Sequence, residues 1–161
     1  MESTKKRNYI LAAIFIALSV GIWAYRNNEE KKEIESLVNV IMKADNSTRS
    51  LKYIKSGFSK DSLVDFKGAI EDFTKSIRVK PNNSLAYYGR GLAKYDTEDY
   101  RGAISDCTKS IEMDSNYSDA YVIRGLSEYL LNEKESACLD FNKAAELDNS
   151  VAYDLIKKHC N

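Results

Sequence analysis

The sequence predicts an all-α protein in which three helix pairs stack into a solenoid, closed by a C-terminal helix and preceded by a transmembrane helix. The 161-residue chain contains one proline and seven glycines, so little in it interrupts helices. An uncharged apolar run lies near the N-terminus, and from residue 50 onward the sequence repeats with a period of 34 residues. Basic and acidic residues balance at 24 each, so the charge pattern indicates no nucleic-acid partner.

The first predicted element is a membrane segment at residues 9–25, which follows a basic tail at residues 1–8. As a helix it spans roughly 25 Å, slightly less than a ~30 Å hydrocarbon core. Tyr9 and Trp23 place amphipathic rings at its two ends, where interfacial anchors lie. We expect an uncleaved single-pass anchor, with a signal peptide cleaved after Ala24 as the alternative. Because a short basic tail normally stays inside, we expect the rest of the chain on the non-cytoplasmic side of the membrane.

Residues 26–49 form the second predicted element, an amphipathic helix. Its apolar side chains recur at helical spacing, and they are Ile34, Leu37, Val38, Ile41 and Met42. Two interpretations remain open. The segment is either a half-repeat that caps the array, or a stalk that extends the membrane helix and pairs two chains into a homo-oligomer.

The repeated region comprises residues 50–83, 84–117 and 118–151. The first two units share 15 of 34 positions, and the second and third share 12. Each unit predicts two helices joined by a short polar linker, such as residues 97–99 in the middle unit. Residues 152–161 carry one apolar stripe, and we expect them to form the helix that closes the array.

Tyrosine, glycine and alanine recur at positions 4, 8 and 20 of every unit, and this pattern resembles the tetratricopeptide repeat. The residues that carry the resemblance are Tyr53, Tyr87, Tyr121, Gly57, Gly91, Gly125, Ala69, Ala103 and Ala137. Position 24 holds Phe73, Cys107 and Phe141, and the proline of position 32 is present only in the first unit. The resemblance implies a right-handed superhelix that binds a protein partner. The sequence contains no motif for catalysis or for a cofactor, so neither is expected.

The stretch around Gly91 carries three further expectations. Small residues at positions 8 and 20 let the two helices of a pair approach closely. Gly89 recurs in no other unit, so we expect it to cost about 1 kcal/mol of helix propensity. Arg90 recurs as Arg124, and both are expected to form surface or inter-repeat pairs rather than ligand contacts.

The resemblance also implies where a partner binds, because the first helices line the concave surface of such arrays. The expected groove residues are Ile54, Phe58, Tyr88, Leu92, Tyr95, Val122, Leu126 and Tyr129. This groove suits a peptide with apolar anchors and accommodates a basic residue. A well-known subgroup holds acidic chaperone tails with a clamp of lysine, asparagine and arginine. The clamp positions here hold Ile54, Phe58, Gly89, Asp119 and Ile123, so that ligand is not expected.

Three cysteines and one histidine limit the available chemistry. Catalytic triads and multi-histidine metal sites need more than His159 supplies. Cys138 and Cys160 resemble the pair that brackets the last helical turn in bacterial repeat proteins of this type, which implies a disulfide in an oxidising compartment. The alternative is that both are small buried residues. Cys107 lies at a core position and is expected to be a packing residue.

Overall fold

In a computed structural model of the chain, residues 28–160 are described and contain seven helices. The chain divides into two units, residues 1–45 and residues 46–161. The predicted basic tail and membrane segment, residues 1–25, lie outside the described residues. Within residues 28–160, none of the helices combines the length and the apolar content that a membrane crossing requires.

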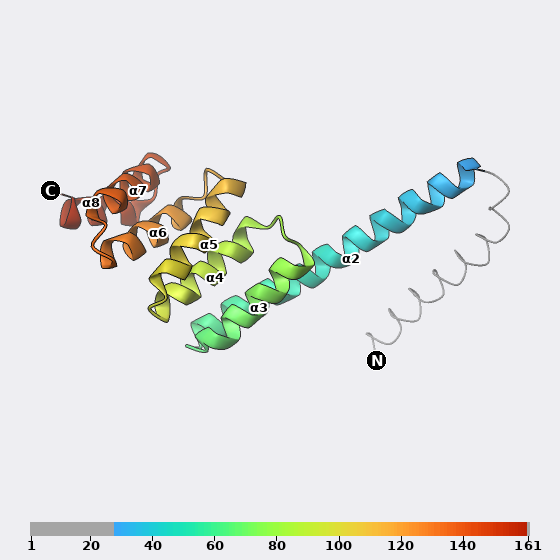
Figure 1. The fold of residues 1–161 in the computed structure, drawn as a ribbon, viewed down its shortest axis with the longest axis horizontal. Helices are drawn as coiled ribbons and strands as arrows, with labels where there is room; N and C mark the ends of the chain where they lie inside the picture. Colours follow the sequence, from blue (N-terminus) through green and yellow to red (C-terminus); the bar gives the residue numbers. More distant parts are fainter. Residues whose placement is uncertain (1–27, 161) are drawn as a thin grey trace. The chain divides into compact units, whose positions relative to one another are not determined.

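Helix α2 runs without a break from Asn28 to Ser62, and its residues belong partly to each unit (Figure 1). A half-repeat cap at residues 26–49 would need a turn before residue 50, and the structure has none there. The reason is local: residues 28–56 contain neither glycine nor proline, so nothing in them stops a helix. Five apolar side chains in the first half of α2 are exposed, and they are Leu37, Val38, Val40, Ile41 and Met42.

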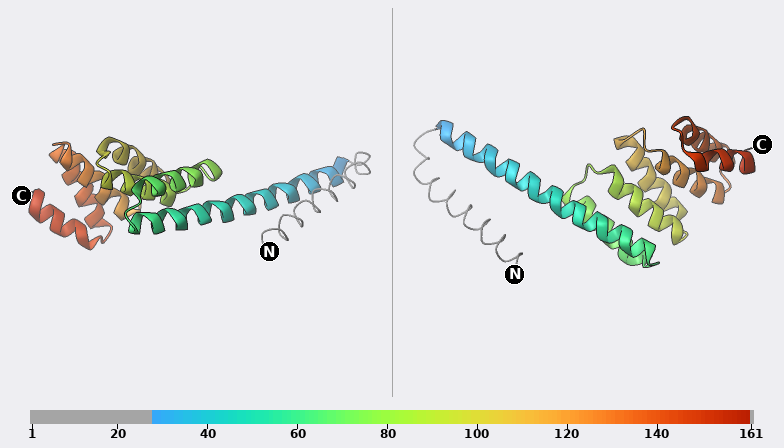
Figure 2. Two further views of the ribbon diagram at one scale, coloured as in Figure 1. Left: turned by 90° about the horizontal axis from the view of Figure 1, so that it is seen from below. Right: turned by 180° about the vertical axis from the view of Figure 1, so that it is seen from behind.

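The second unit is a stack of helix pairs whose boundaries repeat every 34 residues, as the period predicts. The first helices are the end of α2, α4 (Ser84–Asp96) and α6 (Ser118–Leu130). The second helices are α3 (Phe66–Val79), α5 (Tyr100–Met113) and α7 (Lys134–Glu146). Helix α8 (Ser150–His159) follows the last pair. Figures 1 and 2 show α3 to α8 succeeding one another along the stack in chain order.

The turn inside each pair has the same backbone conformation. Val64, Glu98 and Asn132, all at position 15 of their repeat, have φ values of 64°, 65° and 65°. In the first two pairs an aspartate follows and caps the second helix. The side chains of Asp65 and Asp99 accept hydrogen bonds from backbone N–H groups three residues on, at 3.1 and 3.0 Å. These caps start α3 and α5 immediately after the turn.

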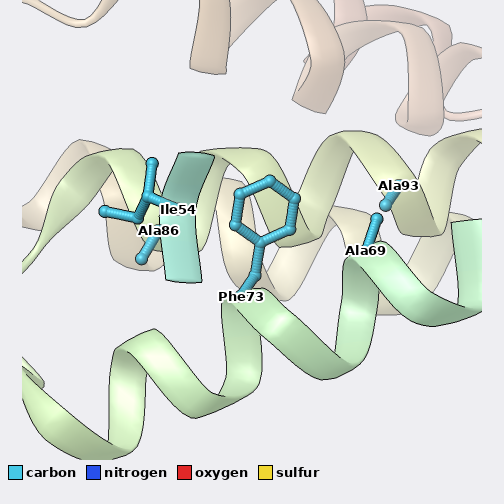
Figure 3. Close-up of a cluster of buried hydrophobic side chains, with 5 residues drawn as sticks. All are labelled: Ile54, Ala69, Phe73, Ala86 and Ala93. Carbon is cyan, nitrogen blue, oxygen red and sulfur yellow. The ribbon is translucent and has the colours of Figure 1, made fainter. Parts of the chain in front are cut away.

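The first core cluster is built around Phe73, whose side chain is fully buried. Figure 3 shows Phe73 and Ala69 of α3 beside Ile54 of α2 and two alanines of α4. Gly57 of α2 faces the ring, and a Cβ added there would lie 2.8 Å from it. Gly89 of α4 faces the same ring even more closely. Gly89 therefore does more than weaken its helix, because its missing side chain makes room for the aromatic ring of the preceding repeat.

Helix α8 is built like the first helix of a further repeat, but it starts two residues earlier than the period predicts. Ala152 is fully buried and Tyr153 follows it, as an Ala-Tyr pair does at positions 3 and 4 of the second and third repeats. Asn149 accepts a hydrogen bond from the N–H of Val151 at 3.1 Å, which starts the helix. The closing helix thus begins at Ser150 rather than at residue 152, and the third repeat is shorter than its predicted range of 118–151.

A disulfide joins Cys138 of α7 to Cys160 at the end of α8, with the two Cα atoms 5.7 Å apart. It closes a loop over a sequence separation of 22 residues, for which the chain-entropy model gives a stabilisation of about 3 kcal/mol. The closing helix is therefore covalently held to the last pair. Cys107 is a free, buried thiol that packs with Ala120 and Ile123, as a packing residue does.

Candidate partner-binding surface

The first-helix surface consists of the side chains at positions 2, 5, 9, 12 and 13 of α2, α4 and α6. Two of the eight predicted groove residues occupy position 5 but are buried beneath this surface. Ile54 is 4% exposed and packs with Phe73, whereas Val122 is 7% exposed and packs with Tyr121 and Ala144. Both point into the core between helices, so the prediction that they contact a ligand is corrected. The remaining six are half-buried.

Aromatic rings form a continuous line across the first two repeats of this surface. The ring centroids of Phe58 and Tyr88 are 6.5 Å apart, and those of Tyr88 and Tyr117 are 4.8 Å apart. Leu92, Tyr95 and Leu126 pack against the same buried cluster as Tyr88. Four predicted groove residues from α4 and α6 are thus brought together.

Tyr117 was not among the predicted residues, because position 34 lies just before the first helix. One signal was present in the sequence: a tyrosine stands where the preceding boundary has Asn83. Tyr129 behaves differently from the other predicted aromatics. Its ring lies 4.2 Å from that of His159, so it contacts the closing helix instead of the line of rings.

Three carboxylates act electrostatically on Tyr88, the tyrosine at the centre of this surface. Burial raises the pKa of Tyr88 to about 12, and the charges of Asp119, Asp61 and Asp96 act in the same direction. Burial, together with the charge of Asp96, also raises the pKa of Asp61. Oδ1 of Asp61 is inaccessible to solvent and accepts no hydrogen bond. Asp119 accepts one from Asn149 at 2.8 Å.

The first-helix surface carries no compensating positive charge, since none of its positions in the three repeats is lysine or arginine. The two arginines of the repeated pattern are engaged elsewhere. Arg90 forms an ion pair with Asp106 at 2.6 Å and reaches Thr74 of the preceding repeat at 3.2 Å. Arg124 pairs with Asp140 in the same way. Each ion pair lies within one repeat, whereas the hydrogen bonds of Arg90 to Thr74 and of Arg124 to Thr108, both at 3.2 Å, reach the preceding repeat as expected.

The described residues also bear on metal binding and catalysis. Within residues 28–160, no group of three or more histidine, cysteine, aspartate or glutamate side chains is placed to hold a metal ion. The thiol of Cys107 is buried, and this burial raises its pKa to about 12. A thiol held in its neutral form is a poor nucleophile.

Residues 85–117, the middle repeat, match the model of the tetratricopeptide repeat. The first such domain of Spaghetti (RPAP3), bound to the HSP90 peptide SRMEEVD, is 25% identical over 71% of this chain and 92% of its own, with a TM-score of 0.69. The repeat array has the tetratricopeptide fold.

Two further solved structures agree. The Arabidopsis OM64 domain is 25% identical and covers 70% of this chain and 95% of its own, with a TM-score of 0.69. The second domain of human RPAP3, in complex with the HSP70 peptide SGPTIEEVD, is 25% identical and covers 72% and 98%, also at 0.69. None of the curated protein sequences matches this chain.

Proposed function

We propose that the array is a protein-interaction module that binds a segment of a partner protein on its first-helix surface. The observation that carries this proposal is the likeness in fold to domains that hold short peptides, the HSP90 and HSP70 peptides among them. The half-buried rings of Phe58, Tyr88 and Tyr117 offer apolar contact area of the kind that anchors peptides.

The charges favour a partner segment that combines an apolar anchor with a basic residue. Both neighbouring peptides end in glutamates and an aspartate. Here such a tail would meet Asp61, Asp96 and Asp119, without a lysine or arginine at the surface positions to receive it. A lysine or arginine of the partner beside Tyr88 would instead be attracted by these carboxylates and would form a cation–π contact with the face of the ring.

We further propose that residues 9–25 anchor the chain in a membrane and that the array lies on the non-cytoplasmic side. The apolar run with its basic flank supports the anchor. The disulfide between Cys138 and Cys160 supports an oxidising compartment, because such bonds are rare in reducing ones.

Partner chemistry is tested with the full chain in mild detergent and a set of labelled peptides that share one apolar anchor. One peptide carries lysines, a second carries glutamines and a third carries glutamates, and binding is read by fluorescence anisotropy. We expect the affinity to fall from the lysine peptide to the glutamine peptide and then to the glutamate peptide. Tyr88→Ala should lower the affinity of the lysine peptide about tenfold. Asp96→Asn should remove most of the preference for lysine, and added salt should do the same.

Leu139→Ala is the matched control, since Leu139 is an exposed apolar residue on a second helix, α7. If the wild type and Tyr88→Ala bind each peptide with the same affinity, the first-helix surface is not the binding site. Binding that Tyr88→Ala weakens but that ignores peptide charge would keep the surface and reject the basic partner.

The location is tested separately in intact cells. A membrane-impermeant thiol reagent is applied before and after reduction, and the labelling of Cys138 and Cys160 is compared. We expect both to be oxidised and to become labelled only after reduction. If both thiols are found reduced and accessible only after lysis, the array lies on the cytoplasmic side.

Self-association is a second candidate, which the exposed apolar side chains of α2 favour. Leu37 and Ile41 are 57% and 50% exposed, and they lie on one face of the helix. A mass measurement in mild detergent distinguishes the candidates. A dimer that Leu37→Glu converts to a monomer supports self-association, and a strictly monomeric wild type excludes it.

A further inference from the structure

Each of the three repeats has a buried aspartate at position 23 that forms ion pairs with basic side chains of the same repeat. In the middle repeat Asp106 is bound by Arg90 at 2.6 Å and by Lys94 at 2.8 Å. In the first repeat Asp72 is bound by Lys60, also at position 11, at 2.7 Å and by Lys75 at 2.9 Å. Each of these buried carboxylates therefore has two cationic partners, which offset the cost of burying it.

The third repeat has the aspartate but not the lysine. Asp140 is 6% exposed and is bound by Arg124 at 2.7 Å, yet position 11 is Glu128. A second carboxylate thus lies where the other two repeats place an ammonium group. Oε2 of Glu128 is inaccessible to solvent and accepts no hydrogen bond. An ionised carboxylate in this position has only Arg124 to offset its charge, and Arg124 is already paired with Asp140. A protonated carboxyl group carries no charge and avoids this cost.

We propose that Glu128 makes the third repeat pH-sensitive: α6 packs firmly against α7 while the buried carboxyl group of Glu128 is protonated, and its ionisation close to buried Asp140 loosens the two helices. The charged groups that act on Glu128 are Asp140 of α7, Glu133 immediately before α7 and Arg124 of α6 itself. Two of the three are negative and oppose ionisation. The consequence reaches the closing helix, because the next residue, Tyr129, contacts His159.

The direction of the pH dependence follows from linkage. Burial first, and then the charge of Asp140, raise the pKa of Glu128 in the folded state to about 7 from its ordinary value of 4.5. A carboxyl group with a raised pKa contributes its full stabilisation below the unfolded value and loses it as the pH rises through the folded value. The third repeat should therefore weaken between roughly pH 5 and pH 8.

The test compares thermal unfolding of the full chain in mild detergent for the wild type, Glu128→Gln and Glu128→Lys. Gln keeps the shape and a donor but does not titrate, whereas Lys restores the pair of the other repeats. We expect wild type and Glu128→Gln to melt together at about pH 5 and to differ by about 5 °C at about pH 8, with the wild type lower. Glu128→Lys should melt highest at the higher pH.

A control variant and a hydrogen-exchange measurement complete the test. Glu135→Gln, a change to an exposed glutamate of α7, is the matched control and should follow the wild type at both pH values. Hydrogen exchange at the higher pH should be faster in the wild type than in Glu128→Gln for amides of α6 and α7, and equal for α3 to α5. A wild type and Glu128→Gln that keep the same difference in melting temperature at both pH values would overturn the proposal. So would an NMR titration in which the Glu128 carboxyl carbon has an unshifted midpoint.

Discussion

At the two junctions between repeats, the large and the small side chain of the core lie at opposite positions. At the first junction Phe73 of α3 fills the space, and Gly89 of α4 leaves room for it. At the second, the equivalent residue of α5 is Cys107, and the equivalent residue of α6 is Ile123. Position 24 of one repeat and position 6 of the next thus exchange a large and a small residue.

At these two junctions, the residues at position 24 and at position 6 of the next repeat are therefore complementary in size. Interiors are packed closely enough that a ring and a branched side chain cannot share the space that a ring and a glycine fill. The glycine at position 8 follows the same logic. A Cβ on Gly57 would lie 2.8 Å from the Phe73 ring, and one on Gly91 would lie 2.9 Å from Sγ of Cys107.

The largest predicted effect is a difference in unfolding free energy when the position-24 residue of each junction is replaced by alanine. Phe73→Ala removes a fully buried ring and should cost about 4 kcal/mol of unfolding free energy, because the cavity cannot collapse completely. Cys107→Ala at the equivalent position should cost about 1 kcal/mol, since only one sulfur atom is removed. Urea unfolding monitored by circular dichroism gives both values, and equal costs would show that the two junctions are packed alike.

A smaller effect is expected when the residue of one junction is placed in the other. Gly89→Ile puts a branched side chain against the Phe73 ring and should cost about 2 kcal/mol despite its better helix propensity. Adding Phe73→Cys to it copies the second junction and should recover most of that loss. A double-mutant cycle measures the coupling, and an additive result would refute the pairing of positions 24 and 6.

How far the sequence predicts these features depends on whether they repeat. The helix boundaries of α4 and α6 follow directly from a period of 34, because the same residue types recur at the same positions. Helix α8 breaks the period by two residues, so its register is not visible until Ala152 is seen to be buried. The burial of Ile54 and Val122 depends on the sizes of their neighbours, which no single-repeat pattern contains.

The same limit applies to α2 and to the ion-pair network. The repeat predicts a boundary at residue 50, but α2 continues through it because no glycine or proline interrupts the helix there. The replacement of a position-11 lysine by Glu128 is visible in the sequence. Its consequence becomes clear only when Lys60 and Lys94 are seen to bind the buried aspartates.

The smallest predicted effect compares the turns of the first and third pairs. Val64 has a φ of 64°, a region that a β-branched residue rarely adopts, and its side chain is 70% exposed. Asn132 adopts the same conformation in the third pair, and asparagine tolerates it. Val64→Asn should therefore stabilise the array by about 1 kcal/mol, measured as a higher urea midpoint with an unchanged slope. Leu63→Asn is the control, because Leu63 is equally exposed but does not have positive φ. If both substitutions raise the midpoint equally, the gain comes from replacing an exposed apolar side chain, and the turn of the first pair is no more strained than that of the third.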